Sequence, residues 1–218
     1  QRGLAETGAR VRECKAGFHP APADIADLTT HEALLQAAVD HFGGVDLLVN
    51  NAGVGAREDF LETTPEHFDR VVGVNLRAAF FLTQRFARHM LDQVARGAAI
   101  RPAIVFITSI SVDTSSPDRA EYCVSKAGLS QLARVCAHRL AADGVNVYEV
   151  RPGITETDMT APVKEKYDAL IASGAVPQGR WGAPEDVARA VASLARGEFA
   201  YSTGGVFEVS GGLNIKRL

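Results

Sequence analysis

Hydrophobic residues along the chain follow two patterns that alternate. Short, mainly apolar runs, typical of buried strands, occur at 45–49, 103–107 and 145–150. Around them, apolar residues recur every three or four positions, as in helices that bury one face, at 30–42, 64–97, 118–142 and 184–196. A last strand is predicted at 205–209. Strands that alternate with long helices predict an α/β fold whose parallel sheet is covered on both faces.

No internal repeat, low-complexity tract or linker divides the chain, so we expect a single domain over residues 1–218. One long stretch, at about 153–182, shows no clear periodicity and is interrupted by Pro162, Gly174 and Pro177. It follows the carboxyl end of the predicted strand 145–150, where open α/β sheets bind ligands. We therefore interpret 153–182 as a substrate loop or lid.

Composition narrows the classes of protein to which the chain can belong. Hydrophobic residues make up 46% and charged residues 22% of its 218 residues, as in an ordinary globular protein. The formal net charge is −3 and no basic run is present, which argues against nucleic acid as a partner. No apolar stretch is long enough to cross a membrane. Its three cysteines fit neither a zinc site nor a disulfide framework, which predicts no metal site and a reducing, cytoplasmic location.

The segment Tyr122-Cys123-Val124-Ser125-Lys126 carries a candidate acid/base pair. Residues at i and i+4 lie on the same face of a helix, one turn apart. An ammonium group beside a phenol favours the phenolate, which makes Tyr122 able to exchange a proton near neutral pH. The alternative is a solvated tyrosine–lysine pair on the surface, which the pattern alone fits better.

Three further polar positions accompany this pair. Ser109 ends the strand at 103–108, at the sheet edge where α/β sites form, and can reach the start of the Tyr122 helix. Asn75 lies in an apolar helical run; it is either a surface residue or a residue that breaks the backbone ladder and holds water. Another strand ends in Asn50-Asn51-Ala52-Gly53, where small residues let a ligand approach the backbone.

These motifs, in this order and spacing, resemble the short-chain dehydrogenases/reductases, in particular members similar to 3-oxoacyl-[acyl-carrier-protein] reductases. The resemblance covers about residues 24–212 and implies a Rossmann-like, doubly wound parallel sheet in three α/β/α layers. Its motifs are Leu48–Gly53, Val74-Asn75-Leu76, Ile107-Thr108-Ser109, Tyr122-x-x-x-Lys126-Ala127-Gly128, Arg151-Pro152-Gly153-x-x-x-Thr157-Asp158-Met159 and the tail 205–212.

The resemblance also implies catalytic roles for four residues. Tyr122 would be the acid/base that gives a proton to a carbonyl oxygen or takes it from a hydroxyl. Lys126 would favour the phenolate and bind the nicotinamide ribose. Ser109, with Ser111 as its only serious rival, would hydrogen-bond the substrate oxygen. Asn75 would hold the water that links Lys126 to solvent.

A cofactor, NAD or NADP, is implied by the same resemblance, which does not indicate a preference between the two. Asn51, Ala52 and Gly53 would line its adenosine side. Asp24 would contact the adenine amino group, although a surface aspartate beside a helix fits its position equally well. The carboxamide and pyrophosphate would meet Pro152, Gly153, Thr155 and Thr157.

The start of the chain departs from the family pattern. The family begins with a strand, a glycine-rich TGxxxGxG turn and a helix whose N-terminus receives the pyrophosphate. Here Gly3, Gly8 and Gly17 follow no convincing strand and lack that spacing, so the first βαβ unit is absent from the sequence. We expect an upstream segment of roughly fifty to sixty residues, in preference to a truncated homologue that could not hold the dinucleotide normally.

The sequence thus predicts an NAD(P)-dependent oxidoreductase that transfers hydride between a nicotinamide cofactor and a carbonyl/alcohol substrate. The small-molecule substrate could be a 3-oxoacyl thioester, a sugar or a small alcohol, with Tyr167, Trp181 and Met159 either shaping its pocket or simply packing the lid. The alternative is a non-catalytic homologue that acts as a binding or oligomerisation module. The resemblance further implies a homo-oligomer, dimer or tetramer, with contacts through the helix from Asp118 and the last strand.

Overall fold

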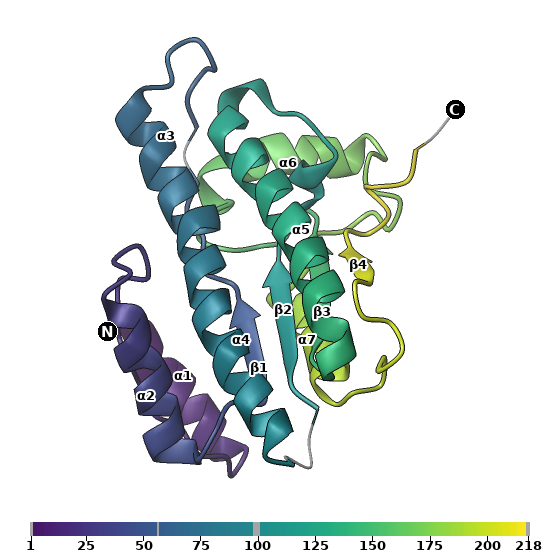
Figure 1. The fold of residues 1–218 in the computed structure, drawn as a ribbon. Coiled ribbons are helices and arrows are strands. Elements are labelled where there is room, and N and C mark those ends of the chain that lie inside the picture. Colours follow the sequence, from purple (N-terminus) through teal and green to yellow (C-terminus); the bar gives the residue numbers. More distant parts are fainter. Residues whose placement is uncertain (1, 56, 98–100, 217–218) are drawn as a thin grey trace.

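The computed structural model describes residues 2–55, 57–97 and 101–216 and centres on a parallel β-sheet (Figure 1). In that part of the chain the sheet has four strands, β1 (Leu47–Asn50), β2 (Ala103–Ile107), β3 (Asn146–Pro152) and β4 (Val206–Val209). They lie in the order β1-β2-β3-β4 and all pair in parallel. The register places Val105 of β2 between Val49 of β1 and Tyr148 of β3. Their carboxyl ends therefore meet at one edge of the sheet.

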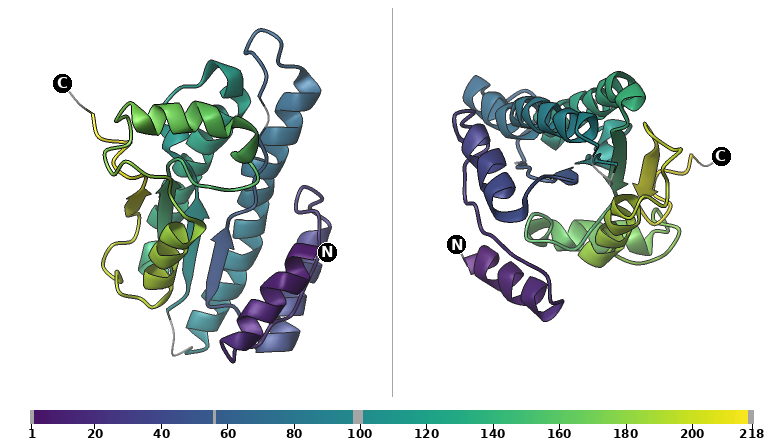
Figure 2. Two further views of the ribbon diagram at one scale, coloured as in Figure 1. Left: turned by 180° about the vertical axis from the view of Figure 1, so that it is seen from behind. Right: turned by 60° about the horizontal axis from the view of Figure 1, so that its bottom comes forward.

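Helices cover both faces of this sheet (Figures 1 and 2). They are α1 (Arg2–Glu13), α2 (Thr30–Phe42), α3 (Pro65–Val72), α4 (Ala79–Ala95), α5 (Ala120–Leu140), α6 (Lys164–Ala172) and α7 (Pro184–Ala195). On one face α4 and α5 pack against the strands around Ile104 and Phe106, and α2 lies against α4. On the other face α7 packs against Val105 and Tyr148.

The continuous apolar character of β2 follows from this double coverage, because all five of its residues are buried. The predicted α/β class with covered parallel strands is confirmed. No helix among the described residues is long and apolar enough to cross a bilayer.

Two predictions about the helices need correction. The pattern at 64–97 is not one uniform helix: α3 and α4 are joined by a π-helical segment, η1 (Gly73–Ala78). The stretch 153–182 is not without regular structure, because it contains α6. Only Tyr167 and Ile171 of α6 are even half-buried, so the helix presents too narrow an apolar stripe to give a clear period.

The early glycines have local structural surroundings. Gly3 and Gly8 lie within α1, and Gly17 lies in the irregular segment after it. A side chain at Gly8 would meet the Phe18 ring at 2.7 Å, so a packing contact accounts for this glycine. In the part of the chain that the structure describes, none of these three glycines follows a strand.

Candidate active site

The predicted catalytic residues approach one another above the carboxyl edge of the sheet. Asn75 is fully buried in the π-helical segment η1. Its side-chain oxygen accepts a hydrogen bond from the Val54 backbone N–H at 2.8 Å, and its amide nitrogen donates to the Val54 carbonyl at 2.9 Å and to the Ser125 hydroxyl at 3.0 Å. Asn75 therefore ties the loop after β1 to α5. Of the two interpretations of this residue, the surface one is wrong and the interrupted helix is confirmed.

Lys126 is buried on α5, one turn after Tyr122. Its ammonium donates a hydrogen bond to the Ile107 carbonyl at the end of β2, at 2.8 Å. Burial, together with a smaller repulsion from the Arg119 charge, lowers the pKa of Lys126 to about 8. A side chain at Gly53 would lie 3.7 Å from the Lys126 nitrogen and 3.3 Å from the Asn75 oxygen. The glycine therefore leaves space beside these two polar groups.

Tyr122 is 8% exposed, and the Lys126 nitrogen lies 5.7 Å from the centre of its ring. The prediction that the two share one helix face is therefore confirmed. Over the ring lies the Arg119 guanidinium, with its central carbon 3.9 Å from the ring centre. Gly55 lies close to both groups: a side chain there would be 3.3 Å from the Tyr122 ring and 3.4 Å from the Arg119 guanidinium.

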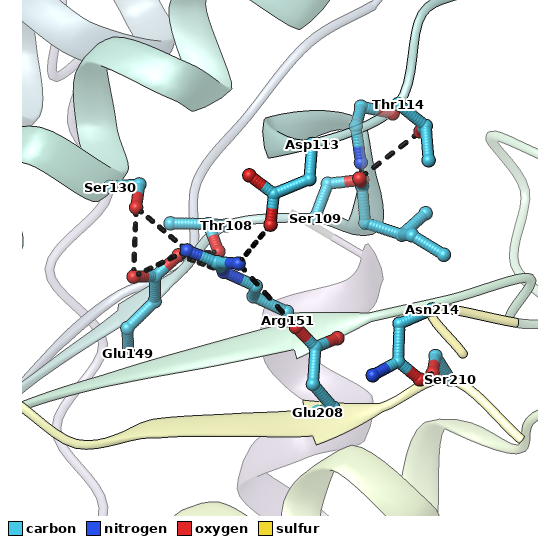
Figure 3. Close-up of polar contacts among 12 residues, drawn as sticks. Thr108, Ser109, Asp113, Thr114, Ser130, Glu149, Arg151, Glu208, Ser210 and Asn214 are labelled. Carbon is cyan, nitrogen blue, oxygen red and sulfur yellow. Dashed lines mark hydrogen bonds and ion pairs between the residues drawn. The ribbon is translucent and has the colours of Figure 1, made fainter. Parts of the chain in front are cut away.

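Ser109 directly follows β2 and is 9% exposed. Its hydroxyl accepts a hydrogen bond from the Ser111 backbone N–H at 3.1 Å and caps the short 3-10 turn η2 (Ile110–Val112) (Figure 3). This turn, which directly follows Ser109, packs against α5, the helix that carries Tyr122. Ser111 lies inside the turn and is half-buried.

Most of the predicted cofactor residues follow either β3 or β1 in the chain. Gly153 follows β3 and is required there, because a side chain would come within 2.7 Å of the Ser210 backbone. Thr155 pairs with Gly182 in an isolated parallel bridge, while Thr157 is exposed.

At the carboxyl end of β1, Asn51 and Ala52 are also exposed. Asp24 is exposed, and among the described residues its carboxylate bonds only within its own turn, to the Ala26 backbone N–H at 2.9 Å. The structure therefore does not bring Asp24 into contact with the other predicted residues.

Comparison with known proteins decides the family. Residues 2–214 match the family described as enoyl-(acyl carrier protein) reductase. The chain is 39% identical over 196 residues to L-rhamnose 1-dehydrogenase (NAD(P)(+)) of Azotobacter vinelandii, covering 88% of this chain and 74% of that protein. It is 33% identical over 192 residues to a 3-oxoacyl-[acyl-carrier-protein] reductase of Haemophilus influenzae, covering 88% and 76%. A crystal structure of 3-oxoacyl-[acyl-carrier protein] reductase from Brucella melitensis in complex with NAD superposes with a TM-score of 0.93 and 46% identity, over 96% of this chain and 83% of that one.

This chain belongs to the short-chain dehydrogenase/reductase family. The predicted resemblance and the predicted Rossmann-like fold are thereby confirmed. Its relatives are named as dehydrogenases and reductases, which makes the family one of oxidoreductases.

Sequence reasoning missed a buried ionic network beside the family's serine position (Figure 3). Glu149 and Arg151 of β3 are both buried, and the Arg151 Nε donates to the Glu149 carboxylate at 2.6 Å. Thr108 donates to the same carboxylate at 2.7 Å and Ser130 of α5 at 2.9 Å. Two opposite charges at i and i+2 of an otherwise apolar buried strand were the available signal, since they must face the same side of the sheet.

The same arginine reaches the loop that follows Ser109. The Arg151 guanidinium donates to Asp113 at 2.5 Å, and Glu208 of β4 lies 3.5 Å away (Figure 3). Asp113 directly follows η2, whose first turn is capped by Ser109. The network therefore fixes both ends of the short turn that begins at Ser109.

A second missed cluster connects α6 to the rest of the site. Arg57, in the loop after β1, donates to Asp118 at 2.7 Å and to the Tyr167 hydroxyl at 3.0 Å. The Tyr167 and Trp181 rings meet edge to face at 5.7 Å, and the Trp181 Nε1 donates to Asp168 at 2.7 Å. Of the predicted pocket residues, Tyr167 and Trp181 thus pack on each other.

Proposed function

We propose that this protein is an NAD(P)-dependent oxidoreductase that transfers hydride between a nicotinamide cofactor and a carbonyl/alcohol pair. The observation that carries the proposal is the placement of Tyr122 and Lys126 on one face of α5. Lys126 is held at the carboxyl end of β2, and the Asn75 hydrogen bonds hold the adjoining loop. This arrangement places a phenol and a buried ammonium where a ligand of an α/β sheet binds.

Each residue of the site has a step that its position supports. In the oxidative direction the Tyr122 phenolate takes the proton of the substrate hydroxyl, while the carbinol carbon gives up a hydride. The Lys126 charge favours the phenolate that this step requires. Ser109 donates a hydrogen bond to the substrate oxygen and steadies the charge that develops on it. Asn75 keeps the loop at Val54 in place, and it would orient a water beside Lys126.

The residues present fit the nicotinamide end of such a cofactor. Gly53 leaves space beside the Lys126 ammonium, which uses one of its three hydrogens on the Ile107 carbonyl. When bound, the nicotinamide dinucleotide would supply the acceptor or donor of hydride. Pro152, Gly153, Thr155 and Thr157 would hold its carboxamide and pyrophosphate, and Asn51, Ala52 and Gly53 its adenosine side. We retain Asp24 as a contact to adenine only within this proposal.

The substrate classes of the relatives, a sugar and a 3-oxoacyl thioester, support a carbonyl/alcohol substrate for this chain. The segment 153–182, with α6 held down by Arg57 and Asp118, would be its lid. The alternative of a non-catalytic binding module has no support, because the Tyr122–Lys126 pair and the Asn75 contacts are all in place.

The test is steady-state turnover by the full-length protein with NAD⁺ and NADP⁺ over a panel of sugars, sugar acids and 3-hydroxyacyl thioesters. Tyr122→Phe should abolish turnover, while titration with NADH or NADPH, followed by nicotinamide fluorescence, still shows saturable binding. Arg139→Gln, at the far end of α5 where Arg139 pairs with Asp143, is the control for a charge change on the same helix. Turnover by Tyr122→Phe at the wild-type rate would refute the proposal.

We also propose that the protein is a homodimer or homotetramer in the cytoplasm. Support for the oligomer comes from apolar side chains that α5 and β4 expose, with Val124 at 54%, Val135 at 55% and Val206 at 39%. Support for the compartment comes from the three free cysteines, Cys14, Cys123 and Cys136. Light scattering after size-exclusion chromatography tests the first proposal, and Val124→Glu together with Val135→Glu should dissociate the oligomer.

A further inference from the structure

Arg119 has an unusual position for an arginine. It is half-buried at the N-terminal end of α5, with its guanidinium over the Tyr122 ring and close to Gly55. Among the residues that the structure describes, this guanidinium forms no ion pair and donates no hydrogen bond. A guanidinium carries five N–H donors and stays charged at any physiological pH, so an unpaired one inside a site lacks the anion that it is suited to bind.

Two other arginines of the site region are paired with carboxylates. Arg151 contacts Glu149 and Asp113, and Arg57 contacts Asp118. Each of these guanidinium groups is therefore neutralised by at least one carboxylate of the chain. Of these three arginines, Arg119 is the one that lies over the Tyr122 ring, and within the described part of the chain it has no carboxylate partner.

The charge of Arg119 also affects Lys126. It is one of the two causes that lower the pKa of Lys126, together with burial. Two cationic groups, Arg119 and Lys126, thus flank Tyr122. The nearest sequence carboxylate, Asp118, is already engaged by Arg57, Lys166 and Ser116. Two positive charges this close to Tyr122 would favour an anionic ligand group beside it.

We propose that Arg119 binds the carboxylate of the substrate, and that the protein acts on a small hydroxy or oxo acid. This inference rests on the proposed oxidoreductase function and deepens it. A carboxylate accepts two parallel hydrogen bonds from one guanidinium, which fixes the orientation of a small molecule as well as its charge. The hydroxyl that reacts at Tyr122 then belongs to a carbon near that carboxylate. Its oxidation releases a hydride to the nicotinamide cofactor and a proton to Tyr122, leaving the oxo acid.

The experiment compares matched pairs of substrates in the full-length enzyme. Several hydroxy acids, including 3-hydroxybutyrate and an aldonate, are each measured beside their primary amides, which have nearly the same shape but no charge. The readout is the ratio of kcat/KM for the acid to kcat/KM for the amide. Both members of a pair use the same Tyr122 and Lys126, so any effect of Arg119 on those groups cancels in the ratio.

We expect the wild type to prefer the acid of at least one pair by about 10- to 100-fold, the range for a hydrogen-bonded charged group. Arg119→Gln should bring that ratio close to one by raising KM for the acid, and Arg119→Lys should keep part of the preference. Arg139→Gln, which removes the same charge at the exposed end of α5, should leave the ratio unchanged.

Three results would overturn the inference. Turnover of acids and amides at equal efficiency by the wild type would exclude carboxylate recognition. If Arg119→Gln instead raised KM for NAD⁺ or NADP⁺ and left the ratio unchanged, Arg119 would bind a dinucleotide phosphate. If only phosphate esters lost efficiency, the anion would be a phosphate. The absence of cofactor reduction with every acid, amide, sugar and neutral alcohol would refute the oxidoreductase function as well, and this outcome is distinct from the first three.

Discussion

The Asn75 side-chain amide donates a hydrogen bond to the Ser125 hydroxyl at 3.0 Å, and the same side chain makes two further bonds to the Val54 backbone. One residue of a π-helical segment thus connects the loop after β1 with the helix that carries Tyr122. The π-helical segment interrupts the regular α-helical hydrogen bonds, and Asn75 lies within it with its side chain buried.

Replacing Asn75 by Leu should therefore cost more stability than removing its partner on α5. Asn75→Leu breaks three hydrogen bonds and leaves two half-buried backbone groups of Val54 without these partners, which we expect to cost about 3 kcal/mol. Ser125→Ala removes one of the three, and about 1 kcal/mol is expected. Urea unfolding of both variants measures the difference. Equal losses would mean that the contacts to Val54 contribute nothing.

The stability of the protein should rise with pH because of Lys126. The pKa of this lysine is lowered from 10.5 to about 8, chiefly by burial and further by Arg119, so between these values the unfolded chain binds more protons than the folded one. The free energy of unfolding then increases as the pH passes from about 8 towards 10.5, by up to ~3 kcal/mol. Lys126→Met removes this contribution.

The measurement is urea unfolding of the wild type and Lys126→Met at several values between pH 7 and pH 10. The difference between the two proteins should change in favour of the wild type as the pH rises. Burial raises the pKa of Cys136 to about 11, which has the opposite effect on stability, but it is present in both proteins and cancels. A pH-independent difference would show that Lys126 titrates alike in the folded and unfolded chains.

Replacing one member of the Glu149–Arg151 pair should destabilise the protein strongly, whereas replacing both by apolar residues should destabilise it less. Both side chains are almost fully buried. Arg151→Met leaves the buried Glu149 carboxylate without a counter-ion, and Glu149→Leu leaves Arg151 only the more exposed carboxylates of Asp113 and Glu208, so about 3–5 kcal/mol is expected for each. Glu149→Leu combined with Arg151→Met removes both charges and should lose less than either single change. Asp113→Asn is the control: its side chain is 68% exposed, and the loss should stay below about 1 kcal/mol.

A double-mutant cycle by urea unfolding gives the coupling between these two residues. Additive losses would contradict the expected coupling. The same variants also test whether the network holds the turn that starts at Ser109, since loosening Asp113 should lower kcat in the full-length enzyme without changing cofactor binding.

The sequence predicted the sheet well because parallel strands covered on both faces leave a strong apolar signature. β2 is the clearest example, since every one of its residues is buried. The Tyr122–Lys126 pair was also predictable, because i,i+4 spacing puts both on one face of any helix. These features depend on local spacing alone, so they need no knowledge of tertiary contacts.

Other features depend on contacts between distant segments and could not be predicted. Arg119 is three residues before Tyr122, and nothing in that spacing indicates that its guanidinium lies over the ring without an anionic partner. The link from Arg57 to Tyr167 joins residues 110 positions apart. Helix α6 was missed for a different reason, because a short helix that is mostly exposed carries little periodicity.

Gly153 should be far less tolerant of a methyl group than Gly73. A side chain at Gly153 would come within 2.7 Å of the Ser210 Cα and 3.0 Å of its carbonyl, and neither the end of β3 nor the start of the loop after β4 can move without disturbing the strand pairing. Gly73 has no neighbour within 4 Å of the same position and helical backbone angles, so Gly73→Ala should leave stability unchanged or raise it by up to about 1 kcal/mol. We expect Gly153→Ala to lower the free energy of unfolding by about 1–3 kcal/mol and to reduce cofactor affinity in the full-length enzyme. Urea unfolding measures the stability of both variants, and nicotinamide fluorescence titration measures their cofactor affinity. A Gly153→Ala protein as stable as Gly73→Ala would show that the backbone at Gly153 can move away from Ser210 without loss of stability.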